Sequence, residues 1–372
     1  MEKQEKKPLS QRYEVGLMIV SVIIVAALVA GISIFPEKGK EVASAAMHMM
    51  TYTFGSTMQF ITVIILIFLV ALGFSKYGSI RLGKEKPDYK TSSWVAMMFF
   101  TGLGAGTVYW AFLEWGYHFN AVPQLEGAAV TEAYAYELSL AYAMFDWGPA
   151  AWALLCVFVL PFAYHYYVKN DKELRFSALC KYTVGDKAVK GLFGKVVDFI
   201  FIFAAIGSIC ITAGTSTSTV ASAVADLLGI SPSFALSVII LLGVSAVLQT
   251  LPFPKFAILL YLVVIILFLA TTLDSCSYTL ASTVSKGLKE GEEPKRGLKF
   301  VWCLIGVAIP LAITFAGTDI NTIKSVVLAT GLPLVIILAI IYYGFLREMK
   351  KDFGRKTRDQ IIAESELPEN AW

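Results

Sequence analysis

The residues best placed for chemistry lie between positions 99 and 119, in the stretch FFTGLGAGTVYWAFLEWGYHF. Three glycines, Gly102, Gly104 and Gly106, lie two apart inside an apolar run that is long enough to cross a bilayer. Because each glycine destabilises a helix by roughly 1 kcal/mol relative to alanine, the run predicts a break in the helix. In lipid, a break survives where its backbone groups face protein or a wet cavity. This pattern is typical of substrate and ion sites in secondary transporters, although closely spaced small residues also permit tight helix packing.

The acidic side chains that lie within apolar segments include Glu114, Asp146 and Asp274. Carboxylates are costly inside a membrane and usually have a partner or a function. Asp274 lies deepest in its segment, and we expect it to form a hydrogen bond between helices. Glu114 and Asp146 lie nearer the predicted ends of their segments. His118 and His165 also lie at helix ends, where we expect solvated or packed imidazoles rather than metal ligands.

The sequence offers little for catalysis. It contains no paired catalytic carboxylates, no histidine cluster and no nucleophile motif, and the five cysteines show neither a disulfide framework nor metal-ligand spacing. A phosphate-binding glycine loop with an adjacent Lys-Thr or Lys-Ser is also missing. We therefore expect neither an enzyme nor an ATP-driven pump, and we expect no metal, no organic cofactor and no nucleic-acid partner.

The composition is that of a membrane protein. Hydrophobic residues make up 57% and charged residues 16% of the 372 residues, whereas soluble domains are about 25% charged. We therefore expect an all-α polytopic membrane protein. The first apolar run has the length of a span rather than of a signal peptide. The candidate spans are Gly16–Phe35, Met58–Phe74, Val95–Phe119, Tyr136–Val168, Val197–Leu228, Ala235–Leu251, Phe256–Val284, Phe300–Gly317 and Ile323–Leu346.

The distribution of basic residues sets the expected orientation. Lys and Arg collect in the N-terminal segment 1–15 and in loops 75–93 and 169–195, whereas loops 120–135 and 229–234 contain neither. Basic residues normally collect in cytoplasmic loops, so this alternation predicts a cytoplasmic N-terminus.

The alternation fails after the sixth candidate span. Loop 286–299 and the tail from residue 347 are basic, yet counting nine spans places both outside. Two interpretations restore the rule. Either one of the segments 235–251 and 256–284 does not span, or an odd number of spans is missing near residues 249–255. The first segment is short and is followed by Leu-Pro-Phe-Pro, so a re-entrant segment there is physically reasonable.

Four motifs, in the same order, resemble the betaine/carnitine/choline transporter family, and the resemblance runs along nearly the whole chain. They are the glycine run 102–106, the segment Tyr109–Tyr117, the stretch Asp146–Trp152 (DWGPAAW) and the stretch Ala270–Ser275 (ATTLDS). The second motif is more similar to the carnitine-type branch than to the glycine-betaine branch. In the third, Asp146 stands where family members usually have histidine.

The resemblance implies an inverted-repeat fold of the LeuT type, in which two repeats of five helices follow two extra helices. The spans from 95 to 251 would form the first repeat. The second repeat would be incomplete, because the central block of about three helices found in family members is missing here. Three is an odd number, so an internal deletion near residues 249–255 also restores the charge alternation.

The expected domain organisation is therefore simple. One transmembrane domain covers residues 16–346, between a cytoplasmic N-terminal segment (1–15) and a basic cytoplasmic tail (347–372).

The resemblance also implies a substrate site. The family's substrates carry a quaternary ammonium group, which cannot donate a hydrogen bond and is held by aromatic faces through cation–π attraction. Trp147 and Trp152 would form two walls of a cage. Trp110 and Tyr117 would add a further wall or a gate, whereas Leu155 stands where many members have tyrosine. The alternative for these four aromatic residues is ordinary packing or anchoring at the membrane interface.

A sodium site is the corresponding expectation for the coupling ion. Thr271 and Thr272 would offer hydroxyls, and backbone carbonyls near Phe100 and Leu103 would complete the shell, because hard cations prefer oxygen ligands. Two alternatives stay open. Threonine hydroxyls in membrane helices often bond to the carbonyl four residues earlier, and the carnitine-type branch includes sodium-independent exchangers.

The sequence thus predicts a secondary transporter, by symport or exchange, of a small trimethylammonium osmoprotectant such as carnitine, glycine betaine or choline. We expect it in the plasma membrane and, by resemblance, as a homotrimer. The alternative is a shortened member of the same family that inserts into the bilayer but does not transport.

Overall fold

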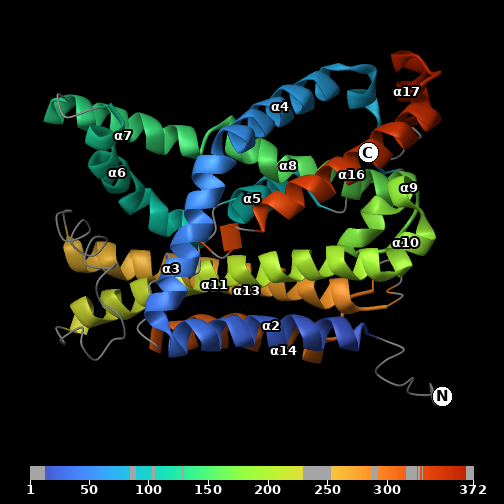
Figure 1. The fold of residues 1–372 in the computed structure, drawn as a ribbon. Helices are drawn as coiled ribbons and strands as arrows, with labels where there is room; N and C mark the ends of the chain where they lie inside the picture. Colours follow the sequence, from blue (N-terminus) through green and yellow to red (C-terminus); the bar gives the residue numbers. More distant parts are fainter. Residues whose placement is uncertain are drawn as a thin grey trace.

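The computed structural model describes residues 13–83, 89–102, 105–126, 130–228, 253–286, 288, 292–315, 325, 327, 328 and 330–365. Every regular element in these ranges is a helix (Figure 1), so the expected all-α class is confirmed. The longer helices are α2 (Val15–Ile34), α3 (Pro36–His48), α4 (Gly55–Phe74), α5 (Thr91–Gly102), α6 (Ala105–Glu126), α7 (Glu132–Asp146), α8 (Pro149–Ala163), α11 (Leu192–Leu228), α13 (Pro254–Val284), α14 (Arg296–Phe315), α16 (Gly331–Phe353) and α17 (Arg358–Ser365). Short helices are η1 (Met49–Thr53), η2 (Lys76–Ser79), η3 (Tyr164–Val168), η4 (Phe176–Cys180), α9 (Lys181–Val184) and α10 (Asp186–Lys190).

Within the described ranges, six segments are long and apolar enough to cross a membrane. The fold is therefore that of a polytopic membrane protein. The six segments are Val15–Ile32, Gly55–Phe74, Glu132–Val168, Leu192–Ile209, Pro254–Val284 and Gly331–Phe353.

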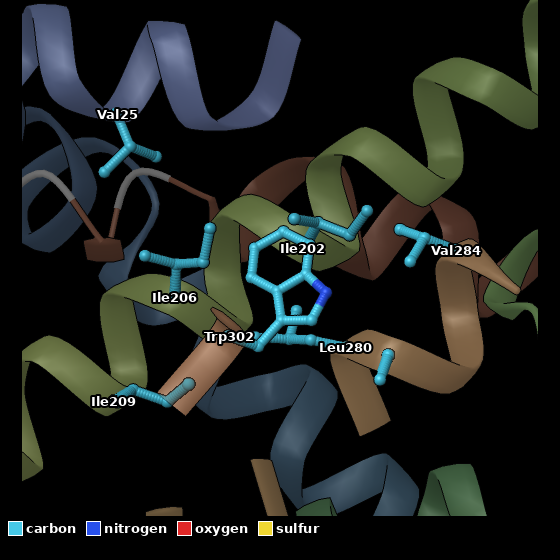
Figure 2. Packing of buried hydrophobic residues seen from close by; sticks show 8 residues of the cluster. Val25, Ile202, Ile206, Ile209, Leu280, Val284 and Trp302 are labelled. Carbon is cyan, nitrogen blue, oxygen red and sulfur yellow. The ribbon is translucent and has the colours of Figure 1, made fainter. Parts of the chain in front are cut away.

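Four long helices, α2, α11, α13 and α14, lie side by side (Figure 1) and enclose the main apolar core (Figure 2). The indole of Trp302, on α14, is fully buried at its centre. The contacts of α11 recur every three or four residues, as a helix with 3.6 residues per turn requires. Around Trp302 lie Val25, Ile202, Ile206, Ile209, Leu280 and Val284.

A second group of helices consists of α4, α8 and α16. Ile65, Val157 and Leu338, one from each helix, are buried against one another. The hydroxyl of Tyr342, on α16, donates a 2.6 Å hydrogen bond to the carbonyl of Val157 on α8. Among the short helices, η4 packs against both α11 and α16, α9 packs against α16 and α10 packs against α11, so that together they connect this group to the first.

Segments far apart in the sequence meet at one end of the molecule, which we call the basic end (right side of Figure 1). The ammonium of Lys76, just after α4, donates to the carbonyls of Gly354 and Lys356, just after α16, at 2.8 and 2.9 Å. Three further contacts close this end: Glu14 with Lys286 at 3.4 Å, Lys169 with Glu348 at 3.0 Å and Arg358 with Ser79 at 3.1 Å.

This arrangement corrects the count of spans. Counting nine spans places the loop from residue 286 opposite the N-terminus, but the structure places Ser285 and Lys286 beside Tyr13 and Glu14. Helix α11 begins at the basic end and α13 finishes there (Figure 1). The helix ends that flank residues 229–252 therefore lie on the same side of the molecule. The candidate span 235–251 lies outside the described residues.

Two other predicted spans are divided. The span 95–119 corresponds to α5 and α6, and the span 136–168 corresponds to α7, α8 and η3 with a corner at Trp147 and Gly148. A Cβ atom on Gly148 would lie 2.9 Å from the carbonyl oxygen of Phe145, so the corner requires glycine. Pro149 then starts α8, because its fixed φ suits the first position of a helix.

Candidate functional site

One side of α6 carries four residues, two of which contact the corner between α7 and α8. Trp110, Glu114, Tyr117 and His118 recur at intervals that place them on one face of a helix with 3.6 residues per turn. Helix α6 packs along α7 (Figure 1), so this face meets the corner at Trp147.

Two side-chain pairs join α6 to the corner. The indole Nε1 of Trp147 donates a hydrogen bond to Glu114. One helical turn further along α6, Nε2 of His118 lies 2.8 Å from Oδ2 of Asp146. Asp146 and Trp147, which are consecutive at the corner, thus contact His118 and Glu114, which are four residues apart on α6. The two pairs together tie the corner to α6.

The second tryptophan is tied to the same corner. The indole Nε1 of Trp152 donates a 2.9 Å hydrogen bond to the carbonyl of Trp147. Both indole N–H groups are therefore bound within the protein, while each tryptophan stays 37% exposed. What the two residues leave available is ring surface, and ring faces attract cations.

Other aromatic rings line the same helix pair. The rings of Trp110 and Tyr117, two turns apart on α6, lie 5.6 Å apart between centroids with a 56° tilt. Tyr136 of α7 stacks on Phe119 at 4.5 Å, and Tyr142 stacks on His118 at 5.6 Å. The interface between α6 and α7 is therefore largely aromatic.

The structure brings the four predicted cage residues together as two pairs. Trp147 and Trp152 share the corner, and Trp110 and Tyr117 contact each other on α6. Glu114 connects the pairs, since it lies between Trp110 and Tyr117 on one helix face and accepts from Trp147.

The sequence interpretation missed the pairing of His118 with Asp146, because it treated each residue as separate. The signal available in the sequence was the spacing of four between Glu114 and His118. The ligand atoms of Glu114, His118 and Asp146 all lie within 4.8 Å of one another, a spacing open to a metal ion. The hydrogen bonds to Trp147 and between His118 and Asp146 already account for these groups.

The glycine run falls between two helices. Helix α5 ends at Gly102, α6 begins at Ala105 and includes Gly106, and Leu103 and Gly104 lie outside the described residues. Of the predicted sodium ligands, Phe100 belongs to α5, whereas Thr271 and Thr272 lie on α13. Helix α13 packs against α6. The carbonyl predicted near Leu103 falls in the undescribed gap.

Helix α13 presents an exposed polar stripe. Thr271, Asp274, Ser275 and Thr279 all lie on its exposed side, at intervals that place them on one helix face. The expected hydrogen bond between Asp274 and another helix is not found among the described residues, because its side chain faces outward. Polar side chains in membrane helices rarely face lipid. This stripe is therefore a surface that another element would be expected to cover.

Comparisons with known proteins agree with this architecture. A family profile described as BCCT, betaine/carnitine/choline family transporter, matches residues 16–248 and 242–354. The chain is 24% identical to the uncharacterized transporter YeaV of Escherichia coli over 448 aligned positions, which cover 79% of this chain and 92% of the relative. It is 21% identical to a carnitine transporter of Acinetobacter baumannii over 512 positions, which cover 95% of this chain and 92% of the relative.

The lengths of these matches carry information of their own. The 512 aligned positions exceed the 372 residues of the chain by 140, so at least 140 positions of the alignment hold no residue of this chain. The two segments that match the family profile meet at residues 242–248.

Proposed function

The chain belongs to the betaine/carnitine/choline transporter family, and from this premise we propose that it is a secondary transporter of a small quaternary-ammonium compound. The observation that carries the proposal is the corner at Trp147. There both indole N–H groups are bound internally and the ring faces stay available. A trimethylammonium group offers no hydrogen-bond donor, so ring faces are its natural partners, at about 0.5–2 kcal/mol per ring.

Carnitine, glycine betaine and choline all carry the required group, and a relative named as a carnitine transporter supports the first of these. Glu114 adds a carboxylate beside the rings, which attracts the positive end of the substrate. We propose Trp147 and Trp152 as the cage, with Trp110 and Tyr117 as the adjoining wall.

The coupling mode is either sodium symport or exchange. For symport, the proposed ligands are the hydroxyls of Thr271 and Thr272 and the carbonyls of Phe100 and Leu103. The packing of α13 against α6 supports this set, because the helix that carries both threonines contacts the helix that follows the glycine run. No other cofactor is proposed.

The proposed location is the plasma membrane, with the basic end on the cytoplasmic side. The segments that meet there contain Lys76, Lys169, Arg175, Lys286 and Arg358, and basic residues collect in cytoplasmic segments. This orientation places the N-terminus in the cytoplasm. We propose a homotrimer from the family alone. Light scattering of the purified protein would test this oligomeric state.

A second candidate function is a shortened member that inserts without transporting. Two observations favour it: the 140 aligned positions without a residue of this chain, and the exposed polar stripe on α13. Both support an internal deletion near residues 249–255, directly after residues 242–248, where the two profile matches overlap. In such a molecule the cage would lack the wall that the missing block supplies.

Uptake and exchange of labelled carnitine, betaine and choline in proteoliposomes separate the two candidates. A transporter accumulates or exchanges at least one substrate, and Trp147→Ala abolishes this while Trp94→Ala, an exposed tryptophan on α5, does not. Substrate-induced quenching of tryptophan fluorescence without any flux would support the shortened, inactive member. Folded protein that neither binds nor transports any of the three compounds would defeat the cage assignment.

A further inference from the structure

A polar cavity of about 320 Å³ lies at the basic end, away from the tryptophan corner. It forms where the residue before α2, the segment 172–175 and the last turn of α13 meet. We call it the basic pocket. Among the described residues its lining consists of Glu14, Lys172, Glu173, Leu174, Arg175, Ser282, Ser285, Lys286 and Leu288.

Ser282 is the unusual member of this lining. Its side chain is buried, only 3% exposed, and its hydroxyl has no hydrogen-bond partner among the described residues. Serine and threonine in a helix ordinarily donate to a carbonyl three or four residues earlier. The neighbouring hydroxyls of α13 do so at 2.7–2.9 Å, namely those of Ser277, Thr279, Thr283 and Ser285. The Ser282 hydroxyl is instead available to a ligand in the pocket.

Three cations, Lys172, Arg175 and Lys286, line the same pocket, and the carboxylate of Glu14 lies between two of them. Oε1 of Glu14 lies 3.4 Å from the ammonium of Lys286 and 3.7 Å from the guanidinium of Arg175. Both distances exceed the 2.7–2.9 Å of a close charge-assisted hydrogen bond. Glu14 thus occupies the place of an anion without bonding either cation closely.

The remaining charges of the pocket are also accounted for. The guanidinium of Arg175 donates two hydrogen bonds to the carboxylate of Asp198, at 2.7 and 2.9 Å, and these bonds fix its position. The ammonium of Lys172 lies 4.0 Å from the centre of the Tyr166 ring. Glu173 adds a second carboxylate to the lining. The described part of the lining thus carries three cations and two carboxylates, and its excess of positive charge grows if the Glu14 side chain turns outward.

We propose that the basic pocket binds the phosphate group of an anionic ligand, which displaces the side chain of Glu14 and receives hydrogen bonds from Ser282, Lys286 and Arg175. Phosphate suits this set because its oxygens accept from a guanidinium, an ammonium and a hydroxyl together. The pocket lies where α2 begins and α13 ends, and both are candidate spans. It is therefore level with the membrane surface, within reach of a phospholipid headgroup or a soluble phosphate.

The test uses the full chain and two probes. Inorganic phosphate is titrated into protein in detergent, and binding is followed by calorimetry. Protein is also reconstituted into phosphatidylcholine vesicles with and without phosphatidylglycerol, and retained lipid is measured by native mass spectrometry. The variants are Glu14→Gln, Ser282→Ala and Lys286→Gln. The matched controls are Thr283→Val, whose hydroxyl already donates to Thr279 and which is not among the lining residues, and Lys187→Gln, an exposed lysine on α10.

The proposal predicts that the variants change the binding affinity in opposite directions. Ser282→Ala and Lys286→Gln weaken binding on the order of tenfold, equivalent to about 1.4 kcal/mol. Glu14→Gln strengthens it, because the competing carboxylate is gone. Both controls leave the binding affinity unchanged.

The two probes distinguish the source of the ligand. If only phosphatidylglycerol shows this pattern, the ligand is a lipid headgroup, and if inorganic phosphate also shows it, the ligand is a soluble phosphate. The proposal would be overturned if neither probe binds, or if a probe binds equally to the parent protein and to all variants. Glu14 and Lys286 lie at the rim, so their variants keep the test decisive if Ser282→Ala does not fold.

Discussion

Trp147 and Glu114 are 33 positions apart in the sequence, yet the indole N–H of the first donates to the carboxylate of the second. This bond makes α6 the support of the corner between α7 and α8. It also gives Glu114 a definite task, which is to position a ring rather than to stay solvated near a helix end.

The first prediction concerns this bond. Glu114→Leu removes the acceptor and Trp147→Phe removes the donor, so a double-mutant cycle between them should give a coupling energy of about 1–3 kcal/mol in thermal unfolding. Glu114→Gln keeps an acceptor oxygen and should lose less stability than Glu114→Leu. The control is Glu137→Leu, which removes an exposed carboxylate from α7 and should show no coupling to Trp147→Phe.

The second prediction concerns Asp198, which is fully buried at the start of α11. Its carboxylate accepts from Arg175 and from the backbone and hydroxyl of Ser177, at 2.7–2.9 Å. Arg175→Ala leaves this charge buried without its cation and should lower the free energy of unfolding by about 3–5 kcal/mol. Arg358→Ala, an exposed arginine at the same end of the molecule, should change it by less than about 1 kcal/mol. Equal losses in the two variants, measured by denaturant unfolding, would contradict this interpretation.

The third prediction concerns pH. Burial by itself raises the pKa of Asp171. The hydrogen bond from Lys181 and the charges of His165 and Lys181 lower it by more than burial raises it, so the net pKa is below its usual value. A depressed carboxylate pKa adds stability above the unfolded-state value, and this stability is lost as the pH falls through the folded-state pKa. The melting temperature of the parent protein should therefore exceed that of Asp171→Asn at neutral pH. The difference should begin to shrink as the pH falls toward about 4, and it should vanish only below the folded-state pKa of Asp171. A difference that is constant with pH would show that the carboxylate charge plays no part.

Lys181, the partner of Asp171, gives the same test from the alkaline side. Its hydrogen bond to Asp171 raises the pKa of Lys181. The stability it adds is present below the unfolded-state pKa and is lost as the pH rises through the folded-state pKa. Lys181→Gln should therefore differ from the parent protein at neutral pH. The difference should begin to shrink above about pH 10, and it should vanish only above the folded-state pKa of Lys181.

The fourth prediction concerns a close approach between α16 and α9. A Cβ on Gly344 would lie 2.5 Å from the hydroxyl of Thr183, which itself donates to the carbonyl of Ile340 at 2.6 Å. Gly344→Ala should destabilise the protein by about 1–3 kcal/mol, because Thr183 must move and break that bond. Gly31→Ala in α2, where a Cβ meets nothing within 4 Å, should be neutral or stabilising by up to about 1 kcal/mol. Thermal unfolding of both variants measures the contrast.

The fifth prediction concerns sidedness. Cysteines introduced at Lys76 and Lys286 should react with a membrane-impermeant thiol reagent from the same side, because both positions lie at the basic end. A cysteine at Glu132, at the start of α7 and away from that end (Figure 1), should react from the other side. The experiment uses a background with the exposed Cys156 replaced by alanine. If Lys286→Cys and Glu132→Cys instead react from the same side of the membrane, the count of nine spans would be correct.

Most helices could be predicted from the sequence alone. Runs of about 20 apolar residues have one stable form in lipid, because a helix satisfies every backbone group within the segment. That reasoning located α2, α4, α11 and α13 to within a few residues. It was less accurate for α16, which begins at Gly331 rather than Ile323 and ends at Phe353 rather than Leu346. It failed at the corner after α7, because length and hydropathy do not register a turn that one Gly-Pro step produces.

The sequence by itself determined the class of protein, the family motifs and which residues could offer rings or charges. Only the tertiary structure decided which of these meet: Glu114 with Trp147, His118 with Asp146, and Glu14 with Lys286. Periodicity reports which face a helix presents to its surroundings, and it follows from the local backbone alone. The partner on that face depends on how helices far apart along the chain pack together, and no local pattern encodes that.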